Sequence, residues 1–355
     1  MSRVLVAMSG GVDSSVAAQL LMRAGYECIG CTMKLYNNED ACVSASRTCC
    51  SLDDIEDARS VAARLGIPYY VFNFTGEFRE NVIGRFACSY EAGLTPNPCI
   101  DCNKYMKFGL LSERARVLGC DYVATGHYAR IEERDGVYFL KKALDPEKDQ
   151  SYVLYSLGQK ELAHTLFPLG SMEKKETRAL ALKVGFLNAE KPDSQDICFV
   201  PGGDYARVIE ANTGRTPPPG DFVDASGNVL GRHRGIIHYT IGQRKGLGIS
   251  AETPLYVCDI RPDDNTVVLG SNEELFKREV FVSEFNWISG EPPKGEVRCL
   301  AKIRYRHREQ SASAFAECGG VRIIFDEPQR AVTPGQAAVL YDGDVVLGGG
   351  TICRE

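Results

Sequence analysis

The 355-residue chain contains no uninterrupted apolar run long enough to cross a bilayer, which takes about 20 such residues. Its start, MSRVLVAMSGG, passes directly into a short strand pattern without the charged-then-apolar segment that directs export. With 44% hydrophobic and 25% charged residues, no clear repeat and no low-complexity tail, the composition excludes a disordered chain. We therefore expect a cytoplasmic globular protein with no membrane partner.

An excess of basic residues is also missing, because the formal net charge is -6. This balance argues against a protein that mainly coats nucleic acid, but it leaves room for local basic patches that dock a folded RNA. The length exceeds one ordinary core, so two or three domains are expected.

Cysteine, by contrast, is abundant, with 14 residues. In a reducing compartment these residues are thiols, metal ligands or catalytic groups rather than a disulfide framework. Cys28 and Cys31 fall in an expected strand, where a spacing of three points the two side chains to opposite faces. Cys99 and Cys102, in NPCIDCNKYMKF, leave four interpretations open: a structural clip, a redox pair, half of a metal site, or the place of the chemistry.

The order of predicted elements indicates an α/β protein. The apolar run of residues 3–8 is typical of a buried strand, and helical and strand patterns then alternate, which predicts a doubly wound parallel sheet over residues 1–200. After residue 201 the chain breaks into short alternating segments separated by Gly, Asp and Asn, including GIIHYTIGQRKGLGI. This pattern of short alternating segments predicts two small β-rich domains, residues 201–272 and 273–355, the last of them a β-barrel.

The segment SGGVDSS, which begins at Ser9, follows the first strand and opens a helix. Gly10 and Gly11 can turn backbone N–H groups inward, and the helix N-terminus favours an anion, so this loop is expected to bind phosphate. It lacks the lysine of a Walker loop. Ser9 and Ser14 are placed to donate to phosphate oxygens, whereas Asp13 either holds magnesium or simply caps the helix.

The motif S-G-G-x-D-S resembles the signature of the PP-loop pyrophosphatase superfamily. That resemblance implies that ATP is cleaved to AMP and pyrophosphate, with a carbonyl-type oxygen adenylated to make it a leaving group. Synthetases for GMP, NAD and argininosuccinate share the motif with several tRNA-modifying enzymes, so the loop alone does not choose the substrate.

Further motifs narrow the choice: TPNPCIDCNKYMKFG, DYVATGHYAR, KDQSYVLY, DSQDICFV, GQRKGLGI, KIRYR and PGQAAVLY. Together with the loop they resemble the bacterial tRNA-specific 2-thiouridylases, the MnmA family, over essentially the whole chain. The resemblance implies an ATP-dependent sulfurtransferase for the wobble uridine of certain tRNAs. ATP activates the C2 oxygen, and sulfur delivered as a persulfide replaces it. The implied partners are tRNA and a cysteine desulfurase or sulfur-relay protein.

Carried over residue by residue, the resemblance implies that ATP is bound, with magnesium as a further cofactor. The implied ATP-binding residues are Ala7, Met8, Ser9, Gly10, Gly11, Val12, Asp13, Ser14, Met33 and Gly126. Met33 would lie against the adenine, although a core methionine is nearly as good an interpretation. Asp13 is also counted among the catalytic residues.

Two cysteines carry the sulfur chemistry that the resemblance implies. Cys102 matches the nucleophile, and Cys198 matches the persulfide carrier, so the two must approach in the fold and are able to form a disulfide when oxidised. Lys104 and Lys107 are expected to favour the Cys102 thiolate, since nearby cations do so. The alternative is a pair of ordinary core cysteines.

The implied tRNA contacts are Asn97, Pro98, Cys99, His127, Lys148, Asp149, Gln150, Arg304, Tyr305 and Gln336. In KIRYRHR, a strand would present Lys302, Arg304, Arg306 and Arg308 on one face for phosphates. A solvated barrel face is the alternative there, and a solvated turn is the alternative for residues 148–150.

Many family members carry Asp at the position of Cys99. With Cys102 and Cys198 this residue completes a set of three thiols, which would leave one iron of a 4Fe-4S cluster open for exogenous sulfide. We therefore keep a cluster hypothesis beside the persulfide scheme, together with the simpler alternative that Cys99 only fills the Asp position. Two rival functions also remain: a PP-loop synthetase for a small metabolite, and a non-enzymatic cysteine-rich RNA-binding protein.

Overall fold

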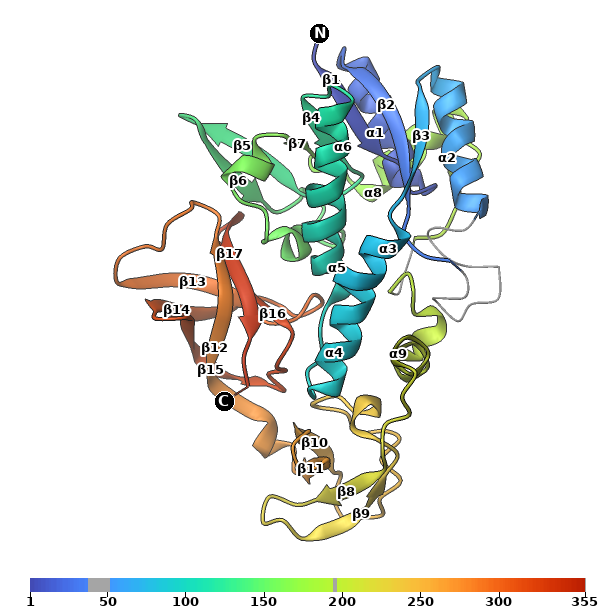
Figure 1. The fold of residues 1–355 in the computed structure, drawn as a ribbon. Coiled ribbons are helices and arrows are strands. Elements are labelled where there is room, and N and C mark those ends of the chain that lie inside the picture. The colour runs from blue at the N-terminus through green and yellow to red at the C-terminus, as the bar shows by residue number, and fades with distance from the viewer. Residues whose placement is uncertain (38–51, 194–196, 355) are drawn as a thin grey trace.

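The computed structural model describes residues 1–37, 52–193 and 197–354. Three sheets divide the chain, and their arrangement is drawn in Figure 1. Residues 194–196 of the DSQDICFV motif lie outside the described part.

The N-terminal sheet is parallel and five-stranded, with the order β3-β2-β1-β4-β7. Its strands are β1 (Arg3–Ala7), β2 (Glu27–Lys34), β3 (Tyr69–Asn73), β4 (Tyr122–Ala124) and β7 (Thr165–Leu166). The helices that alternate with these strands or follow the last of them include α1 (Val12–Arg23), α2 (Leu52–Leu65), α6 (Leu111–Val117) and α8 (Lys174–Val184). This confirms the predicted doubly wound class.

Alternate side chains of each strand enter two different cores, one on each face of the sheet. Val4 and Val6 pack in the core that α1 and α8 cover, whereas Leu5 packs in the core on the opposite face. Cys28 and Cys31 divide in the same way, as their strand spacing predicts. Burial raises the pKa of the Cys28 thiol to about 11, so this residue is an inert part of the core.

A long helical region lies between the three sheets (Figure 1). It consists of α3 (Thr75–Phe78), the π-helical η1 (Arg79–Gly84), α4 (Arg85–Glu91), α5 (Pro98–Asp101) and the π-helical η2 (Cys102–Leu110), which runs into α6. The helix that contains Cys99 and Cys102 begins at Pro98. Asn97 caps it by accepting from the Cys99 amide at 3.1 Å, and proline suits a first helical turn.

The middle of the chain forms a four-stranded sheet with the order β10-β11-β8-β9. Its elements are α9 (Tyr205–Thr213), β8 (Gly220–Val223), β9 (Val229–His233), η5 (Ile236–His238), β10 (Tyr256–Arg261) and β11 (Thr266–Gly270). The strand interpretation of GIIHYTIGQRKGLGI is wrong: after η5 this segment forms turns. Gly242 and Gly246 adopt φ of 86° and 79°, outside the extended conformation that a strand needs.

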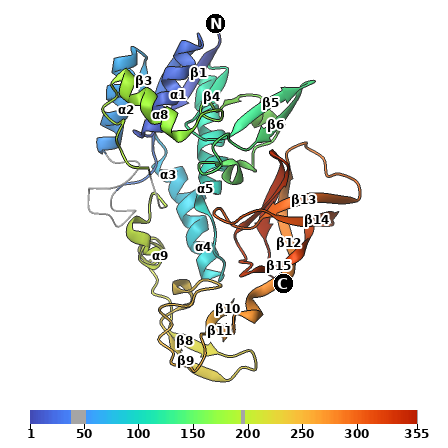
Figure 2. The ribbon, with the colours of Figure 1, turned by 180° about the vertical axis from the view of Figure 1, so that it is seen from behind.

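The last part is a closed antiparallel barrel. Its strands are β12 (Phe276–Trp287), β13 (Glu296–Lys302), β14 (Gln310–Glu317), β15 (Gly320–Arg330), β16 (Ala337–Asp342) and β17 (Val345–Ile352). Pairing of β12 with β17 closes it, which confirms the predicted barrel. A hairpin from the first part of the chain, β5 (Arg130–Arg134) and β6 (Val137–Lys141), extends the barrel sheet by the pairing of Lys141 with Val345. Figure 2 shows this hairpin next to the barrel from behind.

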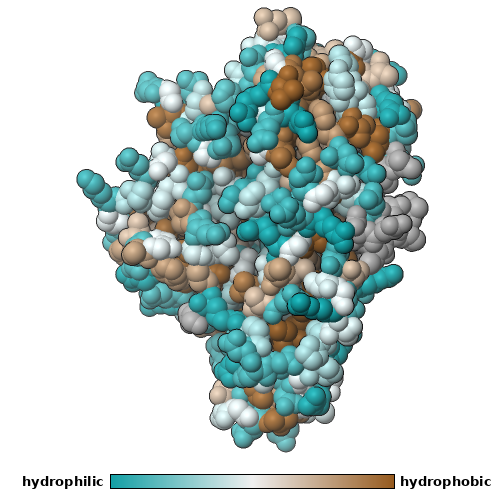
Figure 3. All heavy atoms as spheres, viewed as in Figure 1, coloured by the Kyte–Doolittle hydropathy of each residue, from teal (hydrophilic) through white to brown (hydrophobic). Residues whose placement is uncertain are grey.

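Short elements complete the chain: η3 (Ser151–Leu154), α7 (Gln159–Leu162), η4 (Pro201–Gly203) and η6 (Glu273–Leu275). None of the helices in the described ranges is both long and apolar enough to cross a membrane. On the face drawn in Figure 3, hydrophobic residues gather only in small patches between hydrophilic ones.

The expected row of four cations on one strand is wrong. Strand β13 ends at Lys302, and a turn follows in which the His307 amide donates to the Arg304 carbonyl. Arg304 is half-buried, and its guanidinium donates to the Ala331 carbonyl and, at 2.6 Å, to the Thr333 hydroxyl. The alternation of a strand therefore does not apply beyond Lys302.

Candidate active site

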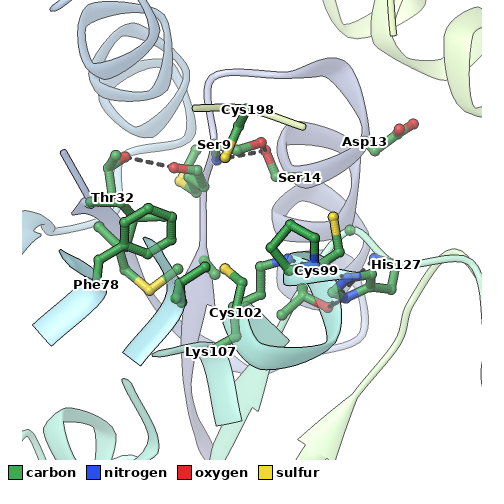
Figure 4. Close-up of a pocket in the computed structure, with 18 of the residues that line it drawn as sticks. Ser9, Asp13, Ser14, Thr32, Phe78, Cys99, Cys102, Lys107, His127 and Cys198 are labelled. Atoms are coloured by element: carbon green, nitrogen blue, oxygen red, sulfur yellow. Dashed lines mark hydrogen bonds between the residues drawn. The ribbon is translucent and has the colours of Figure 1, made fainter. Parts of the chain in front are cut away.

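A cavity of about 350 Å³ lies at the carboxyl edge of the parallel sheet, where ligands bind in doubly wound folds. It brings together the phosphate loop, the end of β2, the start of the helix at Pro98 and the segment around Cys198. The residues that line it include Ala7, Met8, Ser9, Asp13, Ser14, Met33, Pro98, Cys99, Cys102, Lys107, Gly126, His127, Gln150 and Cys198. Figure 4 draws most of the lining residues and labels Ser9, Ser14, Cys99, Cys102, Lys107, His127 and Cys198 among them.

The phosphate loop is held in a narrow slot. Gly10 has a φ of 75°, and a Cβ there would lie 2.4 Å from the Asp54 carbonyl oxygen. Gly126, which follows β4 in the chain, packs directly against the loop. A Cβ at this position would lie 2.7 Å from the Ser14 amide nitrogen. The hydroxyls of Ser9 and Ser14 lie 3.4 Å apart, so both are positioned where a phosphate oxygen would meet them.

Residues far along the chain brace this loop from behind. Asn188 Nδ2 donates to the Gly10 carbonyl at 2.9 Å and to the Ser15 hydroxyl at 3.0 Å. Lys191 Nζ pairs with Asp54 and Asp57 at 2.6 and 2.7 Å on the side of α2. These contacts hold the loop without entering the cavity.

Asp13 is not the helix cap. Gly11 occupies the N-cap position, while Asp13 lies in the first turn and lines the cavity. Its two carboxylate oxygens each accept from Lys174 Nζ at 2.7 Å, and Oδ1 also accepts from the Tyr128 hydroxyl at 3.0 Å. Nothing in the sequence near the loop signalled Lys174 or Tyr128 as its partners.

The three cysteines reach the cavity from two directions. Cys99 and Cys102 come from the beginning of the helix, and Cys198 comes from the chain between α8 and α9. Figure 4 draws Cys198 on the side of Ser9 and Ser14, with the other two across the space. The Tyr36 hydroxyl donates to the Cys198 carbonyl at 2.8 Å, so a residue that follows β2 positions the expected sulfur carrier.

The structure lends no support to a metal site at these cysteines. Within the part of the chain that the structure describes, no group of three His, Cys, Asp or Glu residues is arranged to hold a metal ion. The 4Fe-4S cluster therefore stays a hypothesis.

Lys107 and His127 lie on the side of the cavity that holds Cys99 and Cys102. The Lys107 ammonium is 3.4 Å from His127 Nε2, and His127 Nδ1 is 2.7 Å from the Thr125 hydroxyl. Burial, and then the charge of Lys107, hold the pKa of His127 well below its ordinary value, so the ring is neutral and accepts from Lys107. Lys104 instead lies over the Tyr105 ring, 5.3 Å from its centroid.

Several of the residues expected to contact tRNA lie outside the cavity lining: Lys148, Asp149, Tyr305 and Gln336. Tyr305, 37% exposed, directs its hydroxyl at the Asp149 carbonyl, 3.5 Å away. Gln336 donates to the Thr95 carbonyl at 2.7 Å, beside the loop that leads to Asn97. The Asp149 carboxylate accepts from backbone amides of its own loop, which makes it a bracing group. Lys148 pairs with Asp193 at 3.0 Å.

Comparison with known proteins identifies the family of this chain. The family model described as the tRNA methyl transferase HUP domain matches residues 2–202, the corresponding PRC-barrel domain matches residues 209–271, and the aminomethyltransferase beta-barrel domain matches residues 277–352. A protein of Clostridioides difficile named tRNA-specific 2-thiouridylase MnmA is 51% identical over 99% of this chain and 98% of its own. This chain belongs to the MnmA family.

A second MnmA relative, from Lachnoclostridium phytofermentans, is 51% identical over the whole of both chains. Among solved structures, a 4-thiouridine synthetase in complex with RNA and ATP is 17% identical, with a TM-score of 0.34 over 60% of this chain and 50% of that one. The assignment to MnmA rests on the full-length relatives and not on that weak structural likeness.

Proposed function

We propose that this protein is an ATP-dependent tRNA sulfurtransferase that replaces the C2 oxygen of the wobble uridine with sulfur. The observation that carries the proposal is that Cys102 and Cys198 line the same cavity as Ser9 and Ser14 of the phosphate loop. Activation by ATP and delivery of sulfur need one shared space, because the activated base cannot diffuse between two sites.

In the first step the uridine C2 oxygen attacks the α-phosphorus of ATP, and pyrophosphate leaves. Ser9 and Ser14 hold the phosphates through their hydroxyls, and the N-terminus of α1 stabilises the negative charge. Asp13 is part of the cavity lining and is chemically suited to magnesium. The ion, when bound, would neutralise charge on the phosphates.

In the second step Cys198 carries a persulfide received from a cysteine desulfurase or sulfur-relay protein. The Cys102 thiolate attacks the inner sulfur, so that a disulfide forms between Cys102 and Cys198 and the outer sulfur leaves as hydrosulfide. Hydrosulfide attacks C2 and loses its proton, the C2–O bond breaks, and AMP departs with the former uridine oxygen. A thiol reductant then returns the disulfide to two thiols.

The 4Fe-4S hypothesis receives no support from the ligand arrangement, because the described residues include no group that would hold a metal ion. No step is therefore assigned to a cluster, and Cys99 is given the role of filling the position beside the target base. Sulfur chemistry at two cysteines also accounts for this cavity better than the methyl transfer named in the family-model descriptions.

We further propose that tRNA contacts run from the cavity over Asn97, Pro98, Cys99, His127 and Gln150 to the Tyr305 turn and Gln336 of the barrel. The contacts of Tyr305 with Asp149 and of Gln336 with Thr95 support one surface across both parts of the chain. The three sheets support the division into residues 1–200, 201–272 and 273–355.

The deciding experiment supplies unmodified tRNA, ATP, magnesium and a persulfide donor, and measures AMP and 2-thiouridine. We expect both products with wild-type protein, and AMP without 2-thiouridine with Cys198→Ala. A synthetase for a small metabolite would make AMP only with another acceptor, and would be indifferent to Cys198. An RNA-binding protein with a vestigial loop would bind tRNA and release no AMP.

A further inference from the structure

Lys174 is a buried lysine whose ammonium contacts the phosphate loop, although the residue lies late in the sequence of the N-terminal part. It is the first residue of α8, with 8% of its surface exposed. Its Nζ lies 2.7 Å from both oxygens of Asp13, a residue 161 positions away, and 2.8 Å from Asp193 Oδ1. The aromatic ring of Tyr128 lies alongside, 5.7 Å from Nζ.

The loop needs a cation that its own sequence lacks. Among the described residues that line the cavity, the basic side chains are Lys107 and His127, and both lie on the side of Cys99 and Cys102, across from the loop. A triphosphate entering the loop would meet the Asp13 carboxylate with no positive side chain in the loop to offset its charge. Lys174 is positioned to fill this gap because its partner, Asp13, lies in the cavity wall.

Lys191 provides an instructive comparison, since it is a second partly buried lysine beside the loop. Its ammonium also bonds two carboxylates, those of Asp54 and Asp57, and lies 3.5 Å from the Gly10 carbonyl. Neither of these carboxylates lines the cavity. Lys191 therefore braces the loop from behind, whereas Lys174 is bound to the one loop carboxylate that a nucleotide would approach.

We propose that Lys174 binds the departing pyrophosphate in the adenylation step. This inference rests on the proposed function and adds a residue to it. As ATP and magnesium bind, the Lys174 ammonium moves from Asp13 to oxygens of the β- and γ-phosphates, and the Asp13 carboxylate becomes available to the metal. The exchange keeps each charge paired, since the ammonium gains phosphate and the carboxylate gains a cation.

The surroundings of Lys174 suit a short movement rather than a release into solvent. Asp193, which stays beside the ammonium, also accepts from Lys148 at 3.0 Å and from Arg178 at 2.9 Å. Burial alone would raise the pKa of Asp193, but the bonds from Lys174 and Lys148 lower it to about 2, so it remains a charged anchor. A flexible lysine stem anchored in this way can redirect its ammonium without losing all its partners.

The test compares nucleotides with and without the outer phosphates, using the full chain, magnesium, and no tRNA or sulfur donor. Lys174→Met should weaken the binding of ATP and of pyrophosphate by about ten- to a hundredfold, because a charge-assisted bond to phosphate is lost. Affinity for AMP should change by less than about twofold, since AMP lacks those phosphates. Lys174→Arg should restore part of the ATP affinity.

Lys191→Met is the matched control, because it removes a lysine with similar partners on the other side of the loop. It should weaken ATP and AMP by the same factor. Equal losses of ATP and AMP in Lys174→Met, or an unchanged ATP affinity, would overturn the assignment. If wild-type protein makes 2-thiouridine while Lys174→Met loses ATP and AMP affinity equally, only the inference about Lys174 fails. If wild-type protein binds no ATP, the proposed function itself fails.

Should Lys174→Met fail to fold, wild-type protein provides a second measurement. NMR spectra are recorded with 13C-labelled lysines. The Cε resonance that is present in wild type and missing in the Lys174→Arg variant is assigned to Lys174. It should shift on addition of pyrophosphate and stay unchanged with AMP. A resonance that is indifferent to pyrophosphate at saturation would contradict the proposal.

Discussion

Cys102 and Lys107 line the same cavity although they are five positions apart in one helix. In an α-helix such residues are separated by roughly 140° around the axis. Residues Cys102–Leu110 are π-helical instead, and the Leu111 amide donates to the Met106 carbonyl, five positions back. Because hydrogen bonds of this span stack residues five apart, Lys107 joins Cys102 on the cavity side.

Lys107→Met is therefore expected to slow the reaction of Cys102 with iodoacetamide at pH 7 by up to about tenfold, since a nearby cation favours the thiolate. Peptide mass spectrometry separates Cys102 from the other cysteines. Lys104→Met, which removes the lysine over Tyr105, is the control and should leave the rate unchanged. Equal effects of the two variants would show that the π-helical register does not matter.

Gly126→Ala should abolish tight ATP binding while the fold remains. The added Cβ would lie 2.7 Å from the Ser14 amide, so the loop must move, at a cost of about tenfold or more in ATP affinity. Calorimetric titration measures the affinity, and circular dichroism reports the fold. Gly76→Ala has open space around its Cβ and should bind ATP like wild type. Normal ATP affinity in the Gly126→Ala variant would refute the slot geometry.

Cys99 should be dispensable for sulfur transfer. Cys99→Asp, which places the residue of many family members, and Cys99→Ala should both form 2-thiouridine from a persulfide donor. Anaerobic reconstitution with iron and sulfide should leave no stoichiometric iron in wild type, measured by iron analysis and visible absorption. A cluster present in wild type and lost in Cys99→Ala would restore the 4Fe-4S hypothesis.

Arg304 and Arg306 should respond differently to truncation. Arg304→Ala should lower the free energy of unfolding by about 1–3 kcal/mol, because the Ala331 carbonyl and the Thr333 hydroxyl each lose the hydrogen bond from the guanidinium. Arg306 is exposed in the same turn. Arg306→Ala should leave the melting temperature unchanged and reduce the salt dependence of tRNA binding by about one phosphate contact. An unchanged stability of Arg304→Ala would argue against a structural role.

His127 should make the protein less stable in mild acid. Its pKa is lowered in the folded state, so below about pH 6.5 the unfolded chain binds a proton that the folded chain does not. Stability then falls as pH decreases, by about 1.4 kcal/mol for each pH unit. In urea titrations His127→Gln should remove this component, whereas His164→Gln, at the surface, should retain it. Parallel pH profiles of wild type and His127→Gln would contradict the prediction.

The fold class was predictable from local sequence patterns, whereas most of the cavity lining was expected only through the resemblance to the MnmA family. The SGGVDSS loop between a strand and a helix, the apolar run of β1, and the turn-separated strands of the barrel each carry their own signal. Predictions failed where backbone geometry departs from those patterns. KIRYRHR leaves the strand after Lys302, and the glycines of GIIHYTIGQRKGLGI adopt positive φ.

The sequence by itself determined which residue types are available: a phosphate loop without a lysine, and cysteines at positions 99, 102 and 198. Only the tertiary structure decided which of them meet. It brings Lys174 to Asp13 across 161 positions, places Lys107 and Cys102 on one cavity through a π-helix, and places Cys198 in the same cavity. The physical reason is that hydrogen bonds and ion pairs act over a few ångströms in space, so their partners are set by packing and not by distance along the chain.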